Sequence, residues 1–245
     1  MTAVAGTEAQ PKSPWWLALR VLDEPGAVFK ELAARPRALV PIVLYLVVAC
    51  GTIVGMPASV MRSATEAQFQ KMEQSHPGMI TPEVRERALA RAGSPVARIT
   101  GFAFAGAFGM LMFLVVAAVL RPVFSGMAAD PVTFRQEWAI TVHAYVPQIL
   151  GMVATLIAIA LMRDVQFRFS LGLLFNPETG GFPYRLANQF TLFGAWNVYL
   201  LALGNQVQIR AKGVTTPLLV VGGLWILVNV VWAGVQTAFA GFGLG

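Results

Sequence analysis

Long apolar stretches without an ionisable residue alternate with short polar segments along this chain of 245 residues. Placing Asp, Glu, Lys or Arg at the centre of a bilayer costs roughly 2.5–3.5 kcal/mol, and about 20 residues of α-helix cross the hydrocarbon layer. Five stretches are close to that length and free of charge, and each predicts a transmembrane helix: residues 38–56, 99–120, 139–162, 186–203 and 218–240. The sequence therefore predicts an all-α fold, a polytopic transmembrane bundle of five helices over residues 38–240.

Residues 1–37, which precede the first predicted span, follow a different pattern. A tail over residues 1–12 leads to Ser13-Pro14, which is typical of a helix N-cap followed by proline in the first turn. A second short helix is predicted from Pro25. Both helices are amphipathic and too short to span, so they either lie in the headgroup layer as interfacial helices or form a cap folded onto the spans. The apolar positions of the first helix are Trp15, Trp16, Leu19 and Leu22.

The connection over residues 62–98 is the longest polar segment between predicted spans. Ser63-Ala64-Thr65-Glu66 matches a capping box and predicts the start of one helix. His76-Pro77-Gly78 interrupts that helix, and Thr81-Pro82 predicts the start of another. We expect an extramembrane helical hairpin whose mixed charges are more typical of a solvated face than of a surface that recognises a partner. Residues 241–245 are expected to form a C-terminal tail.

Composition supports a membrane protein and excludes several other classes. Hydrophobic residues make up 56% of the chain and charged residues 12%, against about 45–50% and about 25% in soluble domains. So much apolar surface excludes intrinsic disorder, and a single cysteine, Cys50, excludes a disulfide scaffold. The formal net charge is +6, but the basic residues flank the spans and form no patch interleaved with aromatic residues. We therefore expect no nucleic-acid partner, and we expect these charges to attract the anionic headgroups of membrane lipids.

The sequence contains no recognisable catalytic or cofactor-binding motif. It has no Walker lysine motif, no His-Glu-x-x-His, no Gly-x-Ser-x-Gly and no Cys-x-x-Cys. The two histidines, His76 and His143, lie in a polar loop and in a predicted span, so they do not indicate a shared metal or haem site. We expect a protein that is not an enzyme and that binds no cofactor or metal.

Polar side chains recur at helical spacing on the third, fourth and fifth predicted spans. In one interpretation they form hydrogen bonds between helices and only hold the bundle together. In the other they line a polar cavity for a small solute or a lipid headgroup, with His143 as its only titratable group. The members of this candidate polar face are His143, Gln148, Asn197, Asn229 and Gln236.

A candidate helix-packing face is the second feature predicted within the spans. Small residues recur every four residues in the first two spans, a spacing that lets helix backbones approach closely. In the last span, Gly222, Asn229 and Gln236 share a seam with two tryptophans at alternating steps of three and four. Such faces predict close packing within the chain, or a homo-oligomer or hetero-complex with other membrane proteins. The members of this candidate packing face are Gly51, Gly55, Gly101, Ala105, Gly109, Gly222, Trp225 and Trp232.

The order of several short motifs indicates a family. Two motifs precede the first span: Pro25-Gly26-Ala27-Val28-Phe29 and Arg35-Pro36-Arg37. Thr133-Phe134-Arg135-Gln136 leads into the third span, which contains Ala144-Tyr145-Val146-Pro147, and the fourth contains Trp196-Asn197-Val198-Tyr199. In this order, over residues 25–240, the chain resembles the bacterial branch of the Yip family, the Ypt/Rab-interacting membrane proteins.

The resemblance implies a five-helix bundle in the bacterial inner (cytoplasmic) membrane, with a cytoplasmic N-terminus and the C-terminus on the opposite side. The positive-inside rule does not provide this orientation, because Lys and Arg are divided equally between the two sides that five spans would create. Eukaryotic relatives bind prenylated Rab-type GTPases and act in membrane organisation. This chain lacks their Asp-Leu-Tyr-Gly-Pro motif, so the resemblance does not extend to a GTPase partner.

These observations lead to three hypotheses about function. In the first, the chain is a non-enzymatic integral membrane protein that organises or scaffolds partner membrane proteins or lipids. In the second, it carries a small solute or a lipid through a polar cavity between the third, fourth and fifth spans. In the third, it is an accessory subunit of a larger membrane complex.

Overall fold

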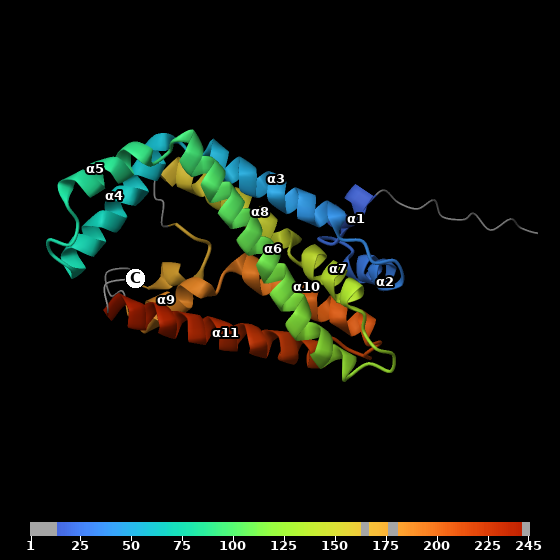
Figure 1. The fold of residues 1–245 in the computed structure, drawn as a ribbon. Coiled ribbons are helices and arrows are strands. Elements are labelled where there is room, and N and C mark those ends of the chain that lie inside the picture. The colour runs from blue at the N-terminus through green and yellow to red at the C-terminus, as the bar shows by residue number, and fades with distance from the viewer. Residues whose placement is uncertain (1–13, 163–166, 176–180, 242–245) are drawn as a thin grey trace, which may run out of the picture.

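Helices joined by short connections make up most of the computed structural model, which describes residues 14–162, 167–175 and 181–241 (Figure 1). The all-α class predicted from the sequence is confirmed. Residues 1–12, Ser13 and residues 242–245, for which a tail, an N-cap and a second tail were predicted, lie outside the described residues. In chain order the elements are α1 (Pro14–Arg20), α2 (Pro25–Ala34), α3 (Leu39–Gly55), α4 (Ala58–Ser75), α5 (Pro82–Arg91), α6 (Pro95–Ser125), α7 (Phe134–Ala144), α8 (Val146–Met162), the 3-10 helix η1 (Leu171–Leu174), α9 (Phe182–Gln189), α10 (Leu192–Gln208) and α11 (Thr215–Gly241).

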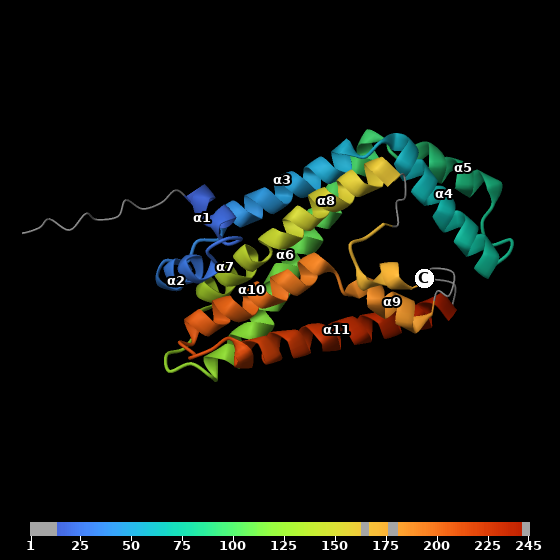
Figure 2. The ribbon, with the colours of Figure 1, turned by 180° about the vertical axis from the view of Figure 1, so that it is seen from behind.

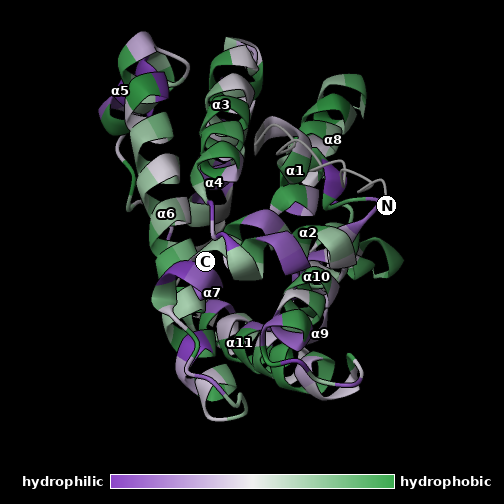
Figure 3. Cartoon of the chain, turned by 90° about the vertical axis from the view of Figure 1, so that its right-hand side faces the viewer, coloured by the Kyte–Doolittle hydropathy of each residue, from purple (hydrophilic) through white to green (hydrophobic). Residues whose placement is uncertain are grey.

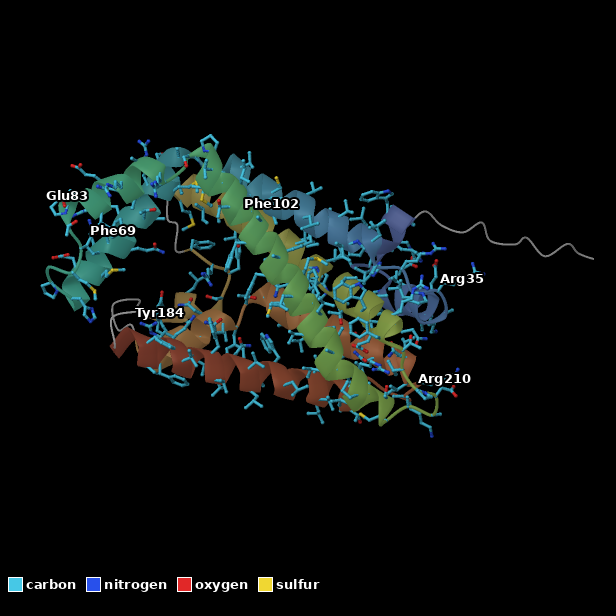
Figure 4. All side chains as sticks on the ribbon, viewed as in Figure 1. Arg35, Phe69, Glu83, Phe102, Tyr184 and Arg210 are labelled. Carbon is cyan, nitrogen blue, oxygen red and sulfur yellow. The ribbon has the colours of Figure 1, made fainter. Side chains whose placement is uncertain are left out.

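The long helices run between the same two ends of the molecule. α3, α6, α7 followed by α8, and α11 each pass from one end to the other, whereas α10 runs from the middle of the molecule to the N-terminal end (Figures 1 and 2). Taken in chain order, these segments alternate in direction. The N-terminal end carries α1, α2 and the connections that precede α7 and α11, whereas the hairpin end carries α4, α5 and α9. In Figure 4, Arg35 and Arg210 mark the N-terminal end, and Phe69 and Glu83 mark the hairpin end.

The predicted number of five spans is not confirmed. Among the described residues, three helical stretches are long and apolar enough to cross a membrane: Pro95–Ser125, Phe134–Met162 and Thr215–Phe239. A fourth candidate joins Leu39–Gly55 to the following helix through a bend of 83°. α10 is only 17 residues long, because the helical path of the predicted fourth span (186–203) breaks between α9 and α10.

Helix caps determine where α6 and α7 begin. Ser94 Oγ accepts a hydrogen bond from the backbone N–H of Ala97 at 3.2 Å, and α6 therefore begins ahead of the predicted span 99–120. Thr133 and Gln136 form a capping box, so α7 begins at Phe134 and not at the predicted residue 139. Both helices therefore extend beyond the purely apolar stretch that the sequence marks as a span.

The capping box predicted at Ser63 is wrong. α4 already begins at Ala58, directly after Pro57, and the Ser63 hydroxyl donates to the carbonyl oxygen of Ser59 within the helix at 3.0 Å. Proline has no backbone N–H, so Pro57 interrupts the helical hydrogen bonding at the bend between α3 and α4. The hairpin is nevertheless present, with α5 starting after a Thr81 side chain that accepts from Val84.

The N-terminal helices form a cap folded onto the bundle. α2 packs against α7 and α10, and Leu17, Val28 and Phe29 are buried in the main apolar core. The other side of α1 leaves Trp15 57% exposed and Trp16 53% exposed. The cap therefore buries its aliphatic face against its own chain and turns its tryptophans outward. The largest fully buried side chains of this core are Leu17, Phe29, Leu32, Phe124, Ile140 and Leu200.

Apolar side chains also cover much of the outside of the long helices. Phe104 of α6 is 73% exposed and Leu219 of α11 is 72% exposed. Seen from the N-terminal end, hydrophobic colouring predominates along α3 and α8, and hydrophilic colouring gathers on α2 (Figure 3). Exposing apolar surface to water is unfavourable by about 25 cal/mol per Å², a penalty that does not arise in hydrocarbon. This surface is therefore suited to contact with lipid.

α3 and α6 approach closely around Tyr45. The Tyr45 hydroxyl donates to the carbonyl oxygen of Ala105 at 2.9 Å, and the ring packs edge-on against Phe113 with centroids 5.3 Å apart. Gly109 makes room for this ring, since a Cβ there would lie 2.7 Å from Tyr45 Cε1 and closer still to the hydroxyl. The small residues of α6 are thus part of a packed helix interface.

Gly109→Ala is expected to destabilise the bundle by about 1–3 kcal/mol, because Tyr45 has to leave its buried position. The melting temperature of the purified protein in detergent, followed by tryptophan fluorescence, measures this loss. Gly51→Ala is the matched control, since no atom lies within 4 Å of a Cβ at Gly51. It should leave the melting temperature unchanged or raise it, because Ala favours helix over Gly. Equal effects of the two substitutions would contradict the assigned α3–α6 interface.

Cysteine labelling tests whether α10 crosses the membrane. In a Cys50→Ser background, Lys212→Cys in the α10–α11 connection is expected to react with an impermeant thiol reagent from the same side as Ala34→Cys, and Met79→Cys from the opposite side. All three positions are exposed. If Lys212→Cys labels together with Met79→Cys, α10 does not cross.

Candidate functional site

A buried carboxylate connects α7 to α10 near the N-terminal end. Glu137 is 0% exposed, and its Oε1 accepts a hydrogen bond from Asn205 Nδ2 at 3.2 Å. Its Oε2 accepts from Gln208 Nε2 at 3.4 Å. Asn205 Nδ2 also donates to the carbonyl oxygen of Leu201 at 3.0 Å. Two amide groups thus turn their N–H donors toward the two oxygens of one buried carboxyl group, so neither oxygen is buried without a partner.

Sequence analysis missed Glu137 because it lies just before the apolar stretch 139–162. The Thr133 capping box extends the helix backward, and Glu137 then shares a face with Ile140 and Ala144, both fully buried. Glu137 therefore lies within the candidate span Phe134–Met162, although the predicted span 139–162 leaves it outside. Ile140 and Ala144 follow Glu137 by three and seven residues, and this helical spacing is the sequence signal that could have revealed the burial of Glu137.

The third predicted span breaks at Tyr145, between α7 and α8. Pro147 has no N–H to donate to the carbonyl of His143, and that carbonyl accepts instead from the backbone N–H of Tyr145. The break also frees the carbonyl of Ala144, which accepts from Asn197 Nδ2 of α10 at 2.8 Å. A side chain from a neighbouring helix therefore satisfies the backbone group that the break exposes, as a helix in lipid requires.

A cavity of about 630 Å³ lies at the N-terminal end, between α1, the connection that precedes α3, the first turns of α3, and α7. We call it the N-terminal cavity. It contains two arginines, two tryptophans and the buried His143, whose Nδ1 contacts the carbonyl oxygen of Ala139 at 2.8 Å. Its lining residues are Trp15, Leu17, Pro36, Arg37, Ala38, Leu39, Val40, Pro41, Val43, Arg135, Trp138 and His143.

A groove of about 370 Å³, more open than the N-terminal cavity, lies between α3, α8 and the residues around the start of α10. Its polar lining includes Gln148 and Thr155 of α8 and the α10 N-cap Thr191. Phe193 closes one side, where it meets Gly151 so tightly that a Cβ there would lie 2.6 Å from the ring.

The structure does not bring the five residues of the candidate polar face into one cavity. His143 lines the N-terminal cavity, Gln148 lines the groove, and Asn197 donates to the Ala144 carbonyl. Asn229 Nδ2 donates to the carbonyl of Trp225 in its own helix at 2.9 Å, and Gln236 Oε1 accepts from Gln189 Nε2 at 3.3 Å. A binding role for this set stays a prediction.

On α6, the candidate packing face lies against α3. A Cβ on Gly101 would be 3.8 Å from Ile53, and Ala105 and Gly109 contact Tyr45 as described above. By contrast, a Cβ on Gly51 or on Gly55 would meet no atom within 4 Å.

On α11, the seam divides between covered and exposed positions. A Cβ on Gly222 would be 4.0 Å from Val198 of α10, and Trp225 packs edge-on against Phe190 with centroids 4.9 Å apart. Trp232 is 53% exposed. The first part of the seam therefore packs within the chain, and an oligomer through the remainder stays a prediction.

The described residues contain no group of three or more His, Cys, Asp or Glu side chains placed to hold a metal ion.

In a comparison with protein families, the family model described as the Yip1 domain matches residues 19–235. The matched range runs from the end of α1 into the last turns of α11. It includes Glu137 with its two amide partners, the groove and the lining of the N-terminal cavity from Pro36 onward, but not Trp15 and Leu17 of α1. The resemblance to the Yip family drawn from the sequence is confirmed, while the bacterial branch stays a prediction. No curated protein and no solved structure matches the chain.

Asn205→Ala is expected to destabilise the protein by about 1–3 kcal/mol, because it removes a donor from a fully buried carboxylate. Asn229→Ala is the matched control: both asparagines donate to the carbonyl four residues earlier, but only Asn205 also reaches an acidic side chain. The control should change stability by about 0.5 kcal/mol or less. Thermal unfolding in detergent compares the two, and equal losses would show that the contact with Glu137 adds no stability.

Proposed function

The chain belongs to the Yip1 domain family, and on that premise we propose that it is a non-enzymatic integral membrane protein that organises or scaffolds partner membrane proteins or lipids. The observation that carries this proposal is what the buried polar side chains contact. Those that contact another helix hold the bundle together, and they do not converge on one solute path.

Three contacts support this use. Tyr45 joins α3 to the α6 backbone, Asn197 joins α10 to the broken backbone at Ala144, and Glu137 joins α7 to two amides of α10. Hydrogen bonds between helices in a membrane contribute about 0.6 kcal/mol each on average. Used in this way, the polar groups rigidify a scaffold, whereas a carrier needs them to face an open path to a solute.

The outer surface of α11 supports a role in association. Leu219, Leu227 and Val231 are exposed, and the chain's own helices leave this side of α11 uncovered. In a membrane it contacts either lipid or a helix of another protein. The orientation implied by the Yip resemblance, with the N-terminal end toward the cytoplasm of a bacterial inner membrane, forms part of the proposal.

The groove lined by Gln148, Thr155 and Thr191 favours a second candidate function, a carrier of a small solute or lipid. For that function the groove has to continue as a water-filled path from the hairpin end to the N-terminal cavity. Ile149 of α8 is 3% exposed and belongs to the apolar cluster around Tyr45, and it lies along the stretch of α8 that such a path would follow.

Native mass spectrometry of the protein released directly from its membrane tests the organising function. The expected result is a particle heavier than the 26.4 kDa chain, containing a second copy, another membrane protein or retained lipid. A hetero-complex of fixed composition would identify the chain as an accessory subunit of that complex. A monomer without bound lipid would contradict the proposal.

Cysteine accessibility separates the carrier from the scaffold in the same preparation. In a Cys50→Ser background, Thr155→Cys in the groove should react with an impermeant thiol reagent, and Ile149→Cys should not. Reaction at both positions would indicate a continuous water-filled path and favour the carrier.

A further inference from the structure

We propose that the N-terminal cavity binds the headgroup phosphate of an anionic glycerophospholipid, through the guanidinium groups of Arg37 and Arg135. This inference deepens the proposed function, because it names the class of lipid that the chain would gather around itself.

The charge of the N-terminal cavity is the first argument. Arg37 and Arg135 are its only charged lining residues, and no Asp or Glu lines it. Within the described part of the chain, neither guanidinium has a hydrogen bond or an ion-pair partner. The nearest acidic residue in sequence, Glu137, is buried against Asn205 and Gln208 of α10. Two uncompensated positive charges in one cavity favour an anion, and guanidinium groups match the geometry of phosphate oxygens.

The shape and lining of the cavity are the second argument. A volume of about 630 Å³ lies within the range of about 300–1,000 Å³ that is typical of small-ligand sites. Apart from the arginines and His143, the walls are apolar or aromatic, and they continue along the first turns of α3 through Leu39 and Val43. Leu39 is 71% exposed, so this apolar wall reaches the outer surface of the bundle. A ligand with an anionic head and an apolar tail satisfies both parts of the lining.

The position of the cavity relative to the membrane is the third argument. Arg37 lies just before α3, at the point where the chain passes from polar sequence into an apolar helix. Trp15 and Trp138 flank the cavity, and tryptophan and arginine are the residues that gather at the headgroup level of a bilayer. A lipid in the adjacent leaflet therefore reaches the arginines with its headgroup while its acyl chains lie along α3.

The apolar wall distinguishes a phospholipid from a free phosphate ion. Inorganic phosphate would use the two arginines alone, whereas a glycerophospholipid also covers apolar side chains of α3. Binding should therefore require the acyl chains, and a deacylated headgroup should bind much more weakly than the intact lipid.

The test uses the full chain in nanodiscs of phosphatidylcholine doped with phosphatidylglycerol, released into the mass spectrometer with its bound lipids. The wild-type protein is expected to retain phosphatidylglycerol preferentially. Each basic residue near a membrane surface contributes about 1 kcal/mol to attraction of anionic lipid, so the double variant Arg37→Gln/Arg135→Gln should lose about thirty-fold in this preference. Arg37→Lys/Arg135→Lys should give an intermediate loss, because it keeps the charge but not the bidentate geometry.

A matched control removes the same charge elsewhere. Arg87→Gln/Arg91→Gln changes two exposed arginines of α5 at the hairpin end and should keep the wild-type preference. If the control and the Arg37/Arg135 variant retain phosphatidylglycerol equally, the inference is overturned. If inorganic phosphate or glycerophosphoglycerol displaces the lipid completely, the site binds free phosphate and the lipid assignment is overturned.

The same spectra report whether the chain is complexed with another copy or another protein. A protein–protein complex that persists without headgroup preference would overturn this inference and leave the proposed scaffold function in place. Headgroup preference in a protein that forms no protein complex would support the inference and limit the organising role to lipids.

Discussion

A polar group buried among apolar helices has to find its partner inside the protein, because hydrocarbon provides none. Much of this structure follows from that constraint. The Glu137 carboxylate draws Asn205 and Gln208 from the end of α10, and the break at Tyr145 is satisfied by Asn197 from the middle of the same helix. α10 is too short to count as a membrane span by length and composition. It nevertheless supplies the hydrogen-bond partners of Glu137 and of the helix break at Tyr145. Its position in the centre of the bundle is therefore set by hydrogen bonds as much as by apolar contact.

The cap formed by α1 and α2 completes the same region from outside. Phe29 and Leu32 extend the apolar core that α6, α7 and α10 share, and this packing holds the chain close to the start of α3 and to α7. The N-terminal cavity lies between α1, the connection before α3, the first turns of α3, and α7. A tightly packed core therefore lies next to an open, positively charged cavity at one end of the bundle.

These features agree with a protein that acts by holding molecules in place. Tyr45, Glu137 and Asn197 connect helices, and the outer faces of α6 and α11 are apolar. The two arginines of the cavity have no partner in the described part of the chain. Lipids and neighbouring membrane proteins are the partners that such surfaces suit.

The sequence by itself determined the features that depend on local periodicity and on the absence of charge. It predicted the all-α class, the apolar stretches that became α3, α6, α8 and α11, the hairpin with its Thr81 start, and the Yip resemblance. These follow from helix geometry and from the free energy of burying charge, which act over a few turns. Only the tertiary structure decided which helix ends meet. Glu137 and Asn205 are 68 residues apart, and each looks like an ordinary helix-end polar residue until α7 and α10 pack together. Arg37 and Arg135 come to line one cavity in the same way, because the connection before α3 lies near α7 only once the core has formed, and no local pattern records that contact.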